Sequence, residues 1–160
     1  TAYIAPPFYI HYDNYTIKIV KRKADMQENR YNRKNRRKYL LKAHIVLVTK
    51  YRKKLLLRKV DETTKEAIQS IAKKNNLDIV AMETDKDHVH ILLSYDATDR
   101  ICDIVKAIKQ ATTYQLWEAH GSYLQRHYWK QHIFWSDGYF ACSIGDVSST
   151  TIEKYIAEQG

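Results

Sequence analysis

The sequence is poor in the residues that build disulfide frameworks, flexible linkers and membrane spans. It has two cysteines, Cys102 and Cys142, which form neither a disulfide framework nor a thiolate metal site and suit a reducing compartment. No apolar run approaches the roughly 20 residues that a membrane helix needs. Four glycines and two prolines leave no long flexible linker. We therefore expect a cytoplasmic protein with no membrane partner.

Acidic residues are also scarce relative to basic ones. Lysine and arginine total 27 against 18 aspartates and glutamates, which gives a formal net charge of +9. Such an excess favours a polyanionic partner, although it also serves solubility. Thirteen tyrosines and three tryptophans add flat faces on which unpaired bases can stack, and many of them must belong to the core. Nucleic acid is the partner class that this composition favours.

The composition changes near residue 41. Residues 1–41 read as an N-terminal extension that contains a short strand pattern, YTIKIV, and a strongly basic stretch, ENRYNRKNRRKYL. We expect the basic stretch to be a mobile arm, with nucleic-acid contact and simple solvation as equal alternatives. Residues 42–160 have the length of one domain with a real core and contain no internal repeat.

Hydrophobic periodicity predicts a regular order of elements in this domain. The strand patterns are AHIVLVTK (43–50), DIVAMETD (78–85), HVHILLSYD (88–96) and YFACSI (139–144), and the helix patterns cover 61–77, 99–119 and 148–159. The second and third strands are joined at TDKD as an antiparallel hairpin. This order predicts an α+β, ferredoxin-like (RRM-like) split β-α-β fold, whose antiparallel sheet has helices on one face and a further helix at the C-terminus.

Two histidines stand one residue apart in the third of these strands. Because side chains alternate along a strand, His88 and His90 project from one face while Val89 projects from the other. Two imidazoles on one face can share a metal ion. The alternative is a pair of histidines that only form hydrogen bonds at the surface of the sheet.

The last predicted helix carries a second pair of candidate residues. Tyr155 and Gln159 are four positions apart and so share one helical face. An amide carbonyl can complete a metal site with two histidines, and tyrosine can attack phosphorus once it is activated. The alternative is surface decoration. Tyr139, in WSDGYF, competes for the nucleophile role but has no ligand-type residue a helical turn away.

Read together, four stretches resemble a known family. KAHIVLVTKYRKKLL, DHVHILLSY, IVKAIKQATTYQL and FWSDGYFACSIGDVSSTTIEKYIAEQG are similar, in this order, to the TnpA-type single-tyrosine HUH transposases of insertion sequences. HUH denotes histidine, hydrophobic residue, histidine. The resemblance covers residues 42–160 and leaves the N-terminal extension aside.

The resemblance implies a transposase that cleaves and rejoins single-stranded DNA with hairpin ends. Tyr155 matches the family's nucleophile, which forms a 5′-phosphotyrosine, and His88, His90 and Gln159 match its metal ligands. The ion would be Mg²⁺ or Mn²⁺. The resemblance also implies a homodimer with sheets joined edge to edge. Candidate phosphate contacts, each equally readable as a solvated charge, are Lys50, Arg52, Lys53, Lys106 and Lys109.

Two other functions remain open at this point. A related HUH endonuclease, such as a rolling-circle initiator, a relaxase or a domesticated repeat-processing enzyme, would share the histidines and the tyrosine. A non-catalytic single-strand binding module on the same fold would need stacking aromatics on its central strands. The strand AHIVLVTK has none, and HVHILLSY has only its terminal tyrosine.

Overall fold

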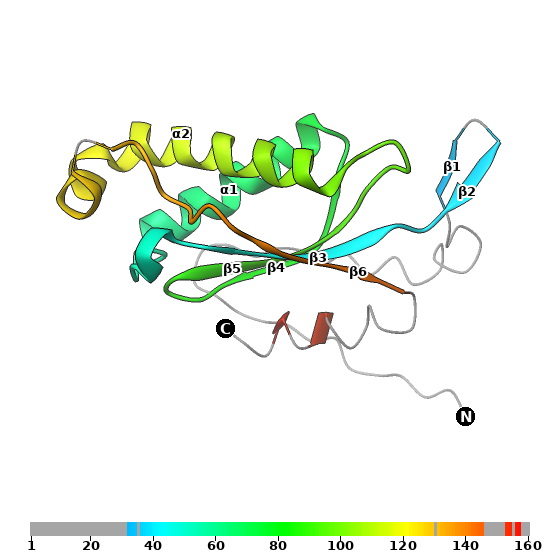
Figure 1. Ribbon diagram of the computed structural model, residues 1–160, viewed down its shortest axis with the longest axis horizontal. Helices are drawn as coiled ribbons and strands as arrows, with labels where there is room; N and C mark the ends of the chain where they lie inside the picture. Colours follow the sequence, from blue (N-terminus) through cyan, green and yellow to red (C-terminus); the bar gives the residue numbers. More distant parts are fainter. Residues whose placement is uncertain (1–31, 35, 130, 146–152, 155, 158–160) are drawn as a thin grey trace, which may run out of the picture.

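The sheet is built from four antiparallel strands, and two of the connections between them pass over a neighbouring strand. The computed structural model describes residues 32–34, 36–129, 131–145, 153–154 and 156–157. Its strands are β3 (Lys42–Val48), β4 (Asp78–Thr84), β5 (His88–Ser94) and β6 (Phe140–Ile144), in the order β4-β5-β3-β6. This is the predicted split β-α-β arrangement, and the expected α+β fold is confirmed (Figure 1).

Two helices, α1 (Lys59–Lys74) and α2 (Ile101–Tyr128), cover one face of the sheet (Figure 1). In α1, Asp61 and Glu62 occupy the first turn and Lys73 and Lys74 the last, so their charges complement the helix dipole. The predicted helix over 61–77 is displaced by two or three residues at each end. Helix α2 begins within two residues of its predicted start but runs nine residues further than expected.

The extra length of α2 follows from burial near its end. The backbone departs from helical geometry at His120 (φ −128°, ψ 21°), just before Gly121, and the helix then continues. Leu124 and Tyr128 are 0% and 4% exposed, so both are core residues. Their burial outweighs the helix-breaking tendency of Gly121, which costs only about 1 kcal/mol relative to alanine.

The central strands β3 and β5 separate two chemically different faces. Ala43, Ile45 and Leu47 alternate along β3 and, with Val89, Ile91 and Leu93 of β5, are buried in the core cluster to which the helices also contribute. Their neighbours point to the opposite face. There, His90 lies directly across from Val46 in the β3–β5 register. The period of two along each strand is therefore what directs both histidines away from the main core.

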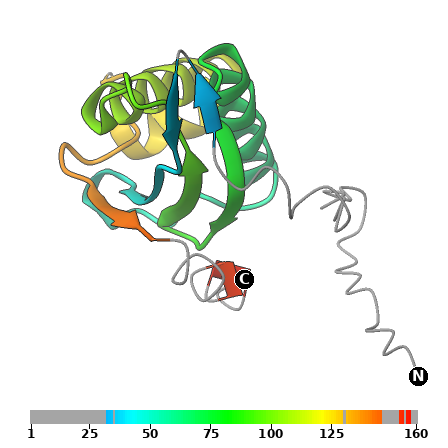
Figure 2. The ribbon, with the colours of Figure 1, turned by 90° about the vertical axis from the view of Figure 1, so that its right-hand side faces the viewer.

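A second, smaller cluster lies on the face that carries the histidines. It contains Leu92, Ile144 and Ile156, with Val80 and Ala81 packed against them. The ladder between β4 and β5 shifts between Ile79 and Ala81, which inserts Val80 as an extra residue. Glu153, Lys154, Ile156 and Ala157 are helical, and Figure 2 shows this part of the chain beyond the sheet, opposite α1 and α2.

Part of the basic N-terminal stretch pairs as a hairpin. Strands β1 (Asn32–Lys34) and β2 (Arg37–Tyr39) pair as a separate two-stranded sheet, with Lys34 opposite Arg37. Arg36 in the connection has φ 66°, the left-handed conformation that two-residue hairpin turns require. Backbone pairing therefore forms within the basic stretch despite the density of like charges, and the mobility of the arm as a whole stays a prediction. The predicted strand YTIKIV lies outside the described residues.

None of the helices in the described part of the chain combines the length and the apolar character needed to cross a membrane.

Candidate functional site

The two predicted histidines lie together on one face of β5. The ring centroids of His88 and His90 are 4.9 Å apart, with ring planes at 72°. Strand β5 pairs with β4 on one side and β3 on the other, so the sheet holds both backbones. His90 is buried at 8% exposure, whereas His88 at the start of the strand is partly exposed. The structure thus brings together the imidazole pair that strand alternation predicts.

Asp87 holds the ring of His88 from the preceding position. His88 Nδ1 is 2.6 Å from Asp87 Oδ1, and the Nε of Arg52 donates to Asp87 Oδ2 at 3.0 Å. The hydrogen bond from His88, together with the charge of Arg52, holds the pKa of Asp87 below its usual range. An ionised carboxylate can only accept, so Nδ1 of His88 carries a proton, and Nε2 is the ring nitrogen that remains for a metal ion.

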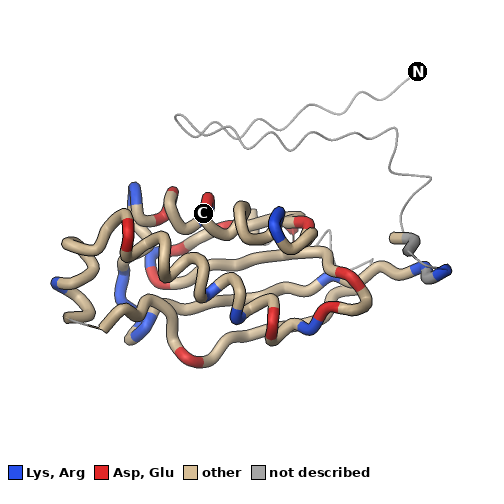
Figure 3. Tube along the Cα trace, turned by 90° about the horizontal axis from the view of Figure 1, so that it is seen from above, with Lys and Arg blue, Asp and Glu red and all other residues tan. Residues whose placement is uncertain are grey.

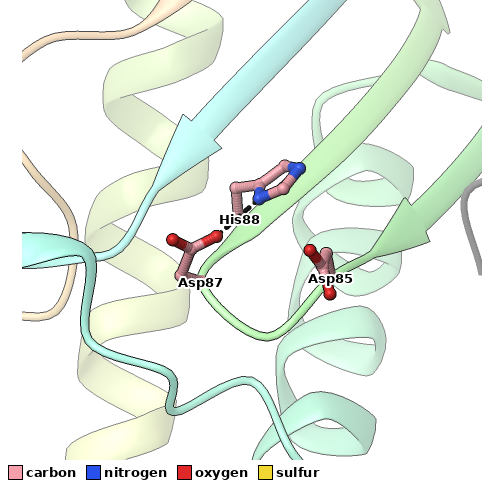
Figure 4. Close-up of side chains that lie close together, drawn as sticks. All are labelled: Asp85, Asp87 and His88. Atoms are coloured by element: carbon pink, nitrogen blue, oxygen red, sulfur yellow. Dashed lines mark hydrogen bonds and ion pairs between the residues drawn. The ribbon is translucent and has the colours of Figure 1, made fainter.

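A third acidic group, Asp85, lies nearby. Candidate ligand atoms of Asp85, Asp87 and His88 are all within 4.8 Å of one another (Figure 4). The Nδ1 proton of His88 already binds Asp87, however, so a cation bound to this ring would use Nε2. Figure 4 shows that nitrogen on the side of the ring away from Asp87. Asp87 is therefore placed to orient His88.

Sequence reasoning missed one member of the site, His44 on β3. Its Nε2 lies 3.0 Å from His90 Nδ1. The two rings are nearly parallel, at 14°, with centroids 5.3 Å apart. The signal that could have found His44 is the same alternation, because it is the one histidine of the AHIVLVTK strand and faces the same side as Val46.

The imidazoles suit a divalent cation as ligands. Burial, followed by the nearby charges of His88 and His44, lowers the pKa of His90 to about 4. Burial likewise lowers the pKa of His44. Rings that are neutral near pH 7 can donate a nitrogen lone pair, and such donors suit Mn²⁺, Co²⁺, Ni²⁺ and Zn²⁺ more than Mg²⁺. The donor set therefore fits a metal site at His88 and His90.

The remaining predicted site residues, Tyr155 and Gln159, lie outside the described residues. Ile156, which follows Tyr155 in the sequence, is 1% exposed and packs with Leu92, two positions after His90 on β5. The C-terminal segment therefore contacts the sheet on the face that carries the histidines.

Comparison with known proteins identifies the family. The model of the family described as "Transposase IS200 like" matches residues 37–159. The chain belongs to the IS200-like transposase family. This membership confirms the resemblance to insertion-sequence transposases, and it indicates an enzyme that processes DNA.

Individual members of the family give the same result. The ISDra2 transposase TnpA of Deinococcus radiodurans is 32% identical over 121 residues, which cover 76% of this chain and 85% of that protein. A crystal structure of a candidate transposase from Deinococcus radiodurans is 30% identical, with a TM-score of 0.66, and the match covers 80% of this chain and 97% of that one.

A more distant structure shares the fold. It is a REP-associated tyrosine transposase bound to a REP hairpin, with 16% identity and a TM-score of 0.56. The match covers 80% of this chain and 75% of that one.

The basic residues of this transposase that were candidates for phosphate contact differ in their surroundings. Lys50 forms an ion pair with Asp137 at 2.7 Å, and the hydrogen bond from Lys50 holds the pKa of Asp137 below its usual range. Arg52 binds Asp87, as described above. The Nζ of Lys53 lies 5.6 Å from the centroid of the Tyr128 ring. These three residues already have roles in holding the loop after β3.

Two lysines on α2, three positions apart, differ more clearly in how far their charges are already used by the fold. Lys109 donates to the backbone carbonyls of Ser136, Asp137 and Gly138 at 2.8, 3.1 and 2.9 Å. Its three ammonium protons are thereby used to hold the loop before β6, and burial lowers its pKa. Lys106 is exposed. A phosphate contact is therefore easier to form at Lys106 than at Lys109.

In the described part of the chain, basic residues lie toward both ends of the molecule. Figure 3 shows lysines and arginines on the β1–β2 hairpin at one end and again toward the opposite end, with acidic and basic residues mixed along the helices between them. A groove of about 770 Å³ runs between α2 and the loop before β6, lined by residues that include Tyr114, Trp117 and His132. Its lining contains neither His88 nor His90, so the groove is separate from the two histidines.

The two lysines allow a matched test. We expect Lys109→Met to lower the free energy of unfolding by about 1–2 kcal/mol, because three carbonyl acceptors lose a partly exposed charged donor. Lys106→Met should leave stability within about 0.5 kcal/mol. If Lys106 contacts phosphate, its loss should also reduce the slope of log K against log salt for DNA binding by about 1. Urea unfolding and salt-dependent binding to single-stranded DNA measure both effects; equal destabilisation by the two variants would contradict the assignment.

Proposed function

We propose that this transposase cleaves and rejoins single-stranded DNA at the ends of an insertion sequence. In this proposal Tyr155 is the nucleophile, and His88, His90 and Gln159 hold a divalent metal ion, Mg²⁺ or Mn²⁺. The observation that carries the proposal is the imidazole pair on the face of β5 opposite the helices. On the same face, Ile156 of the C-terminal segment packs against Leu92, two residues after His90. Tyr155 directly precedes Ile156 in the sequence, and Ile156 is the described residue through which this segment contacts the face that carries the histidines.

The chemistry that these residues would perform is a transesterification. The phenol oxygen of Tyr155 attacks the scissile phosphorus in line, a P–O bond to Tyr155 forms, and the bond to the 3′ oxygen breaks. The tyrosine proton leaves to solvent, and the 3′ oxygen takes up a proton to become a hydroxyl. One phosphate ester replaces another, so the step can run backward and join strands without a nucleotide cofactor.

The chain's own residues position the reacting phosphate. When bound, a divalent metal would polarise the phosphoryl oxygens and stabilise negative charge that develops on them. Asp87 and Arg52 restrain the ring of His88, and the carbonyl of Gln159 would complete the ligand set with His90. The side chain of Arg52 is largely exposed even though its Nε binds Asp87.

A homodimer would use the edge of the sheet formed by β6. This strand pairs with β3 on one side and is the last strand in the sheet order on the other. Its residues 140–143 are exposed on both faces, and Phe140 is 55% exposed. An exposed edge strand with an apolar side chain is a template for pairing with a second copy. We propose that two sheets join here.

A repeat-processing activity is the closest alternative, because it would use the same chemistry on a different hairpin. The two differ in substrate, so the test is incubation with labelled single-stranded hairpins. DNA from the flanks of the gene should yield a covalent protein adduct in the presence of Mg²⁺, whereas scattered genomic repeat hairpins should not. The opposite preference would favour the alternative.

The nucleophile can be tested by removing one oxygen. Tyr155→Phe should preserve folding and DNA binding but abolish cleavage and the covalent adduct, because no phenol oxygen remains to attack phosphorus. Tyr139→Phe is the matched control and should retain both. Mass spectrometry should find the nucleotide on the tryptic peptide that begins with Tyr155, after Lys154. An adduct on a peptide that contains Tyr139 would overturn the assignment.

The metal site can be tested through its two histidines. His88→Ala or His90→Ala should abolish cleavage and weaken Mn²⁺ binding, while binding of a hairpin should change little, because the imidazoles contact the ion and not the duplex stem. His132→Ala, at an exposed histidine away from β5, is the control. Full cleavage by both single variants in Mg²⁺ and in Mn²⁺ would exclude these ligands.

A charge introduced on β6 tests the proposed dimer interface. Ala141→Glu should shift a dimer toward monomer in light scattering, because two like charges would meet at the joined edge. Unchanged mass would place the interface elsewhere.

Mixing Tyr155→Phe with His88→Ala then shows which subunit supplies the tyrosine. Recovery of cleavage in the mixture requires a tyrosine that acts across the dimer, and no recovery indicates action within one subunit.

A further inference from the structure

His44 and His90 are joined edge to edge, not face to face. The distance between His44 Nε2 and His90 Nδ1 is 3.0 Å, and the ring planes differ by 14°. The centroid separation of 5.3 Å equals the 3.0 Å contact plus the centre-to-nitrogen distance of both rings, so the two centroids and the two nitrogens lie nearly on one line that runs in the plane of each ring. The arrangement is therefore a hydrogen bond in the plane of both rings, with the geometry that N–H···N bonds prefer.

One proton lies between these two nitrogen atoms. If His90 donates it from Nδ1, then the Nε2 of His90 keeps a lone pair, and the proton of His44 sits on its own Nδ1. If His44 donates instead, His90 carries its proton on Nε2 and cannot bind a metal there. The identity of the donor thus decides whether His90 is a ligand through Nε2.

The surroundings of His44 restrain its ring. Phe140 of β6 meets the His44 ring edge-on, with centroids 6.0 Å apart and planes at 70°. Strand β3, which carries His44, is paired on both sides, with β5 and β6. The acceptor offered to His90 is accordingly held by the sheet and by a neighbouring aromatic ring.

We propose that His44 is a positioning residue for the metal centre, which accepts the Nδ1 proton of His90 and turns the Nε2 of His90 toward the ion. This proposal rests on the proposed function, in which His88 and His90 are metal ligands. It gives each ligand its own support: Asp87 accepts from Nδ1 of His88, and His44 from Nδ1 of His90. Loss of such a support typically costs 10- to 100-fold in metal affinity.

The test measures Mn²⁺ binding to the whole 160-residue chain by electron paramagnetic resonance of the free ion. His44→Phe keeps a ring but removes the acceptor, and it should raise the Kd for Mn²⁺ about 10- to 100-fold. His44→Gln places an amide oxygen near the position of Nε2 and should recover most of this loss. His132→Phe, which replaces a ring stacked on Trp117 at a distant site, should leave the Kd unchanged.

Three further results separate the alternatives. Pulsed resonance should count the same number of ring nitrogens on Mn²⁺ in wild type and in His44→Phe, and one fewer in the variant would make His44 a ligand and overturn its positioning role. Unchanged affinity of His44→Phe, with binding lost in His90→Ala, would refute this inference and leave the proposed function intact. Undiminished Mn²⁺ binding by both His88→Ala and His90→Ala would instead refute the proposed function.

A measurement on unmodified protein guards against variants that fail to fold. Nitrogen-15 spectra of the metal-free chain should show the proton of His90 on Nδ1 and that of His44 also on Nδ1. A His90 that carries its proton on Nε2 would contradict the proposal.

Discussion

The register between β3 and β5 is the constraint on which the rest of the structure depends. Ile45 lies opposite Ile91 and Val46 opposite His90, so the aliphatic rows of both strands meet the helices while the histidines share the other face. A slip of one residue would turn the histidines into the core and expose the aliphatic row. The burial that stabilises the sheet therefore also assembles the imidazoles.

The end of β3 brings polar groups to the start of β5. Tyr51 and Arg52, within the short helix η1 (Lys50–Arg52), adopt left-handed backbone angles with φ of 60° and 50°. Such angles cost a non-glycine residue about 1 kcal/mol or more. The backbone N–H of Thr49 donates to the carbonyl of Asp87, and Arg52 binds the Asp87 carboxylate. The turn after β3 therefore contacts the residue that precedes His88 at the start of β5. These contacts compensate for the backbone strain and orient His88.

The net positive charge has more than one use in this molecule. Lys109 holds three carbonyls of the loop before β6, and Lys50 pairs with Asp137 of the same loop. These cations stabilise the path of the chain into β6, the strand that flanks His44. Lys106, by contrast, is exposed. A count of basic residues therefore overstates the surface available to DNA, because part of it is committed to the fold.

Local pattern alone was sufficient for α1, the β4–β5 hairpin and the shared face of His88 and His90. Each depends on periodicity and turn chemistry within a few residues, which the sequence by itself determines. The end of α2 and the β1–β2 hairpin were not predictable in this way. Leu124 and Tyr128 extend the helix through distant burial, and backbone pairing overrode a run of like charges. The contact of His44 with His90 joins residues 46 positions apart, so only the tertiary structure decided it, because strand register and not sequence proximity sets which side chains meet across a sheet.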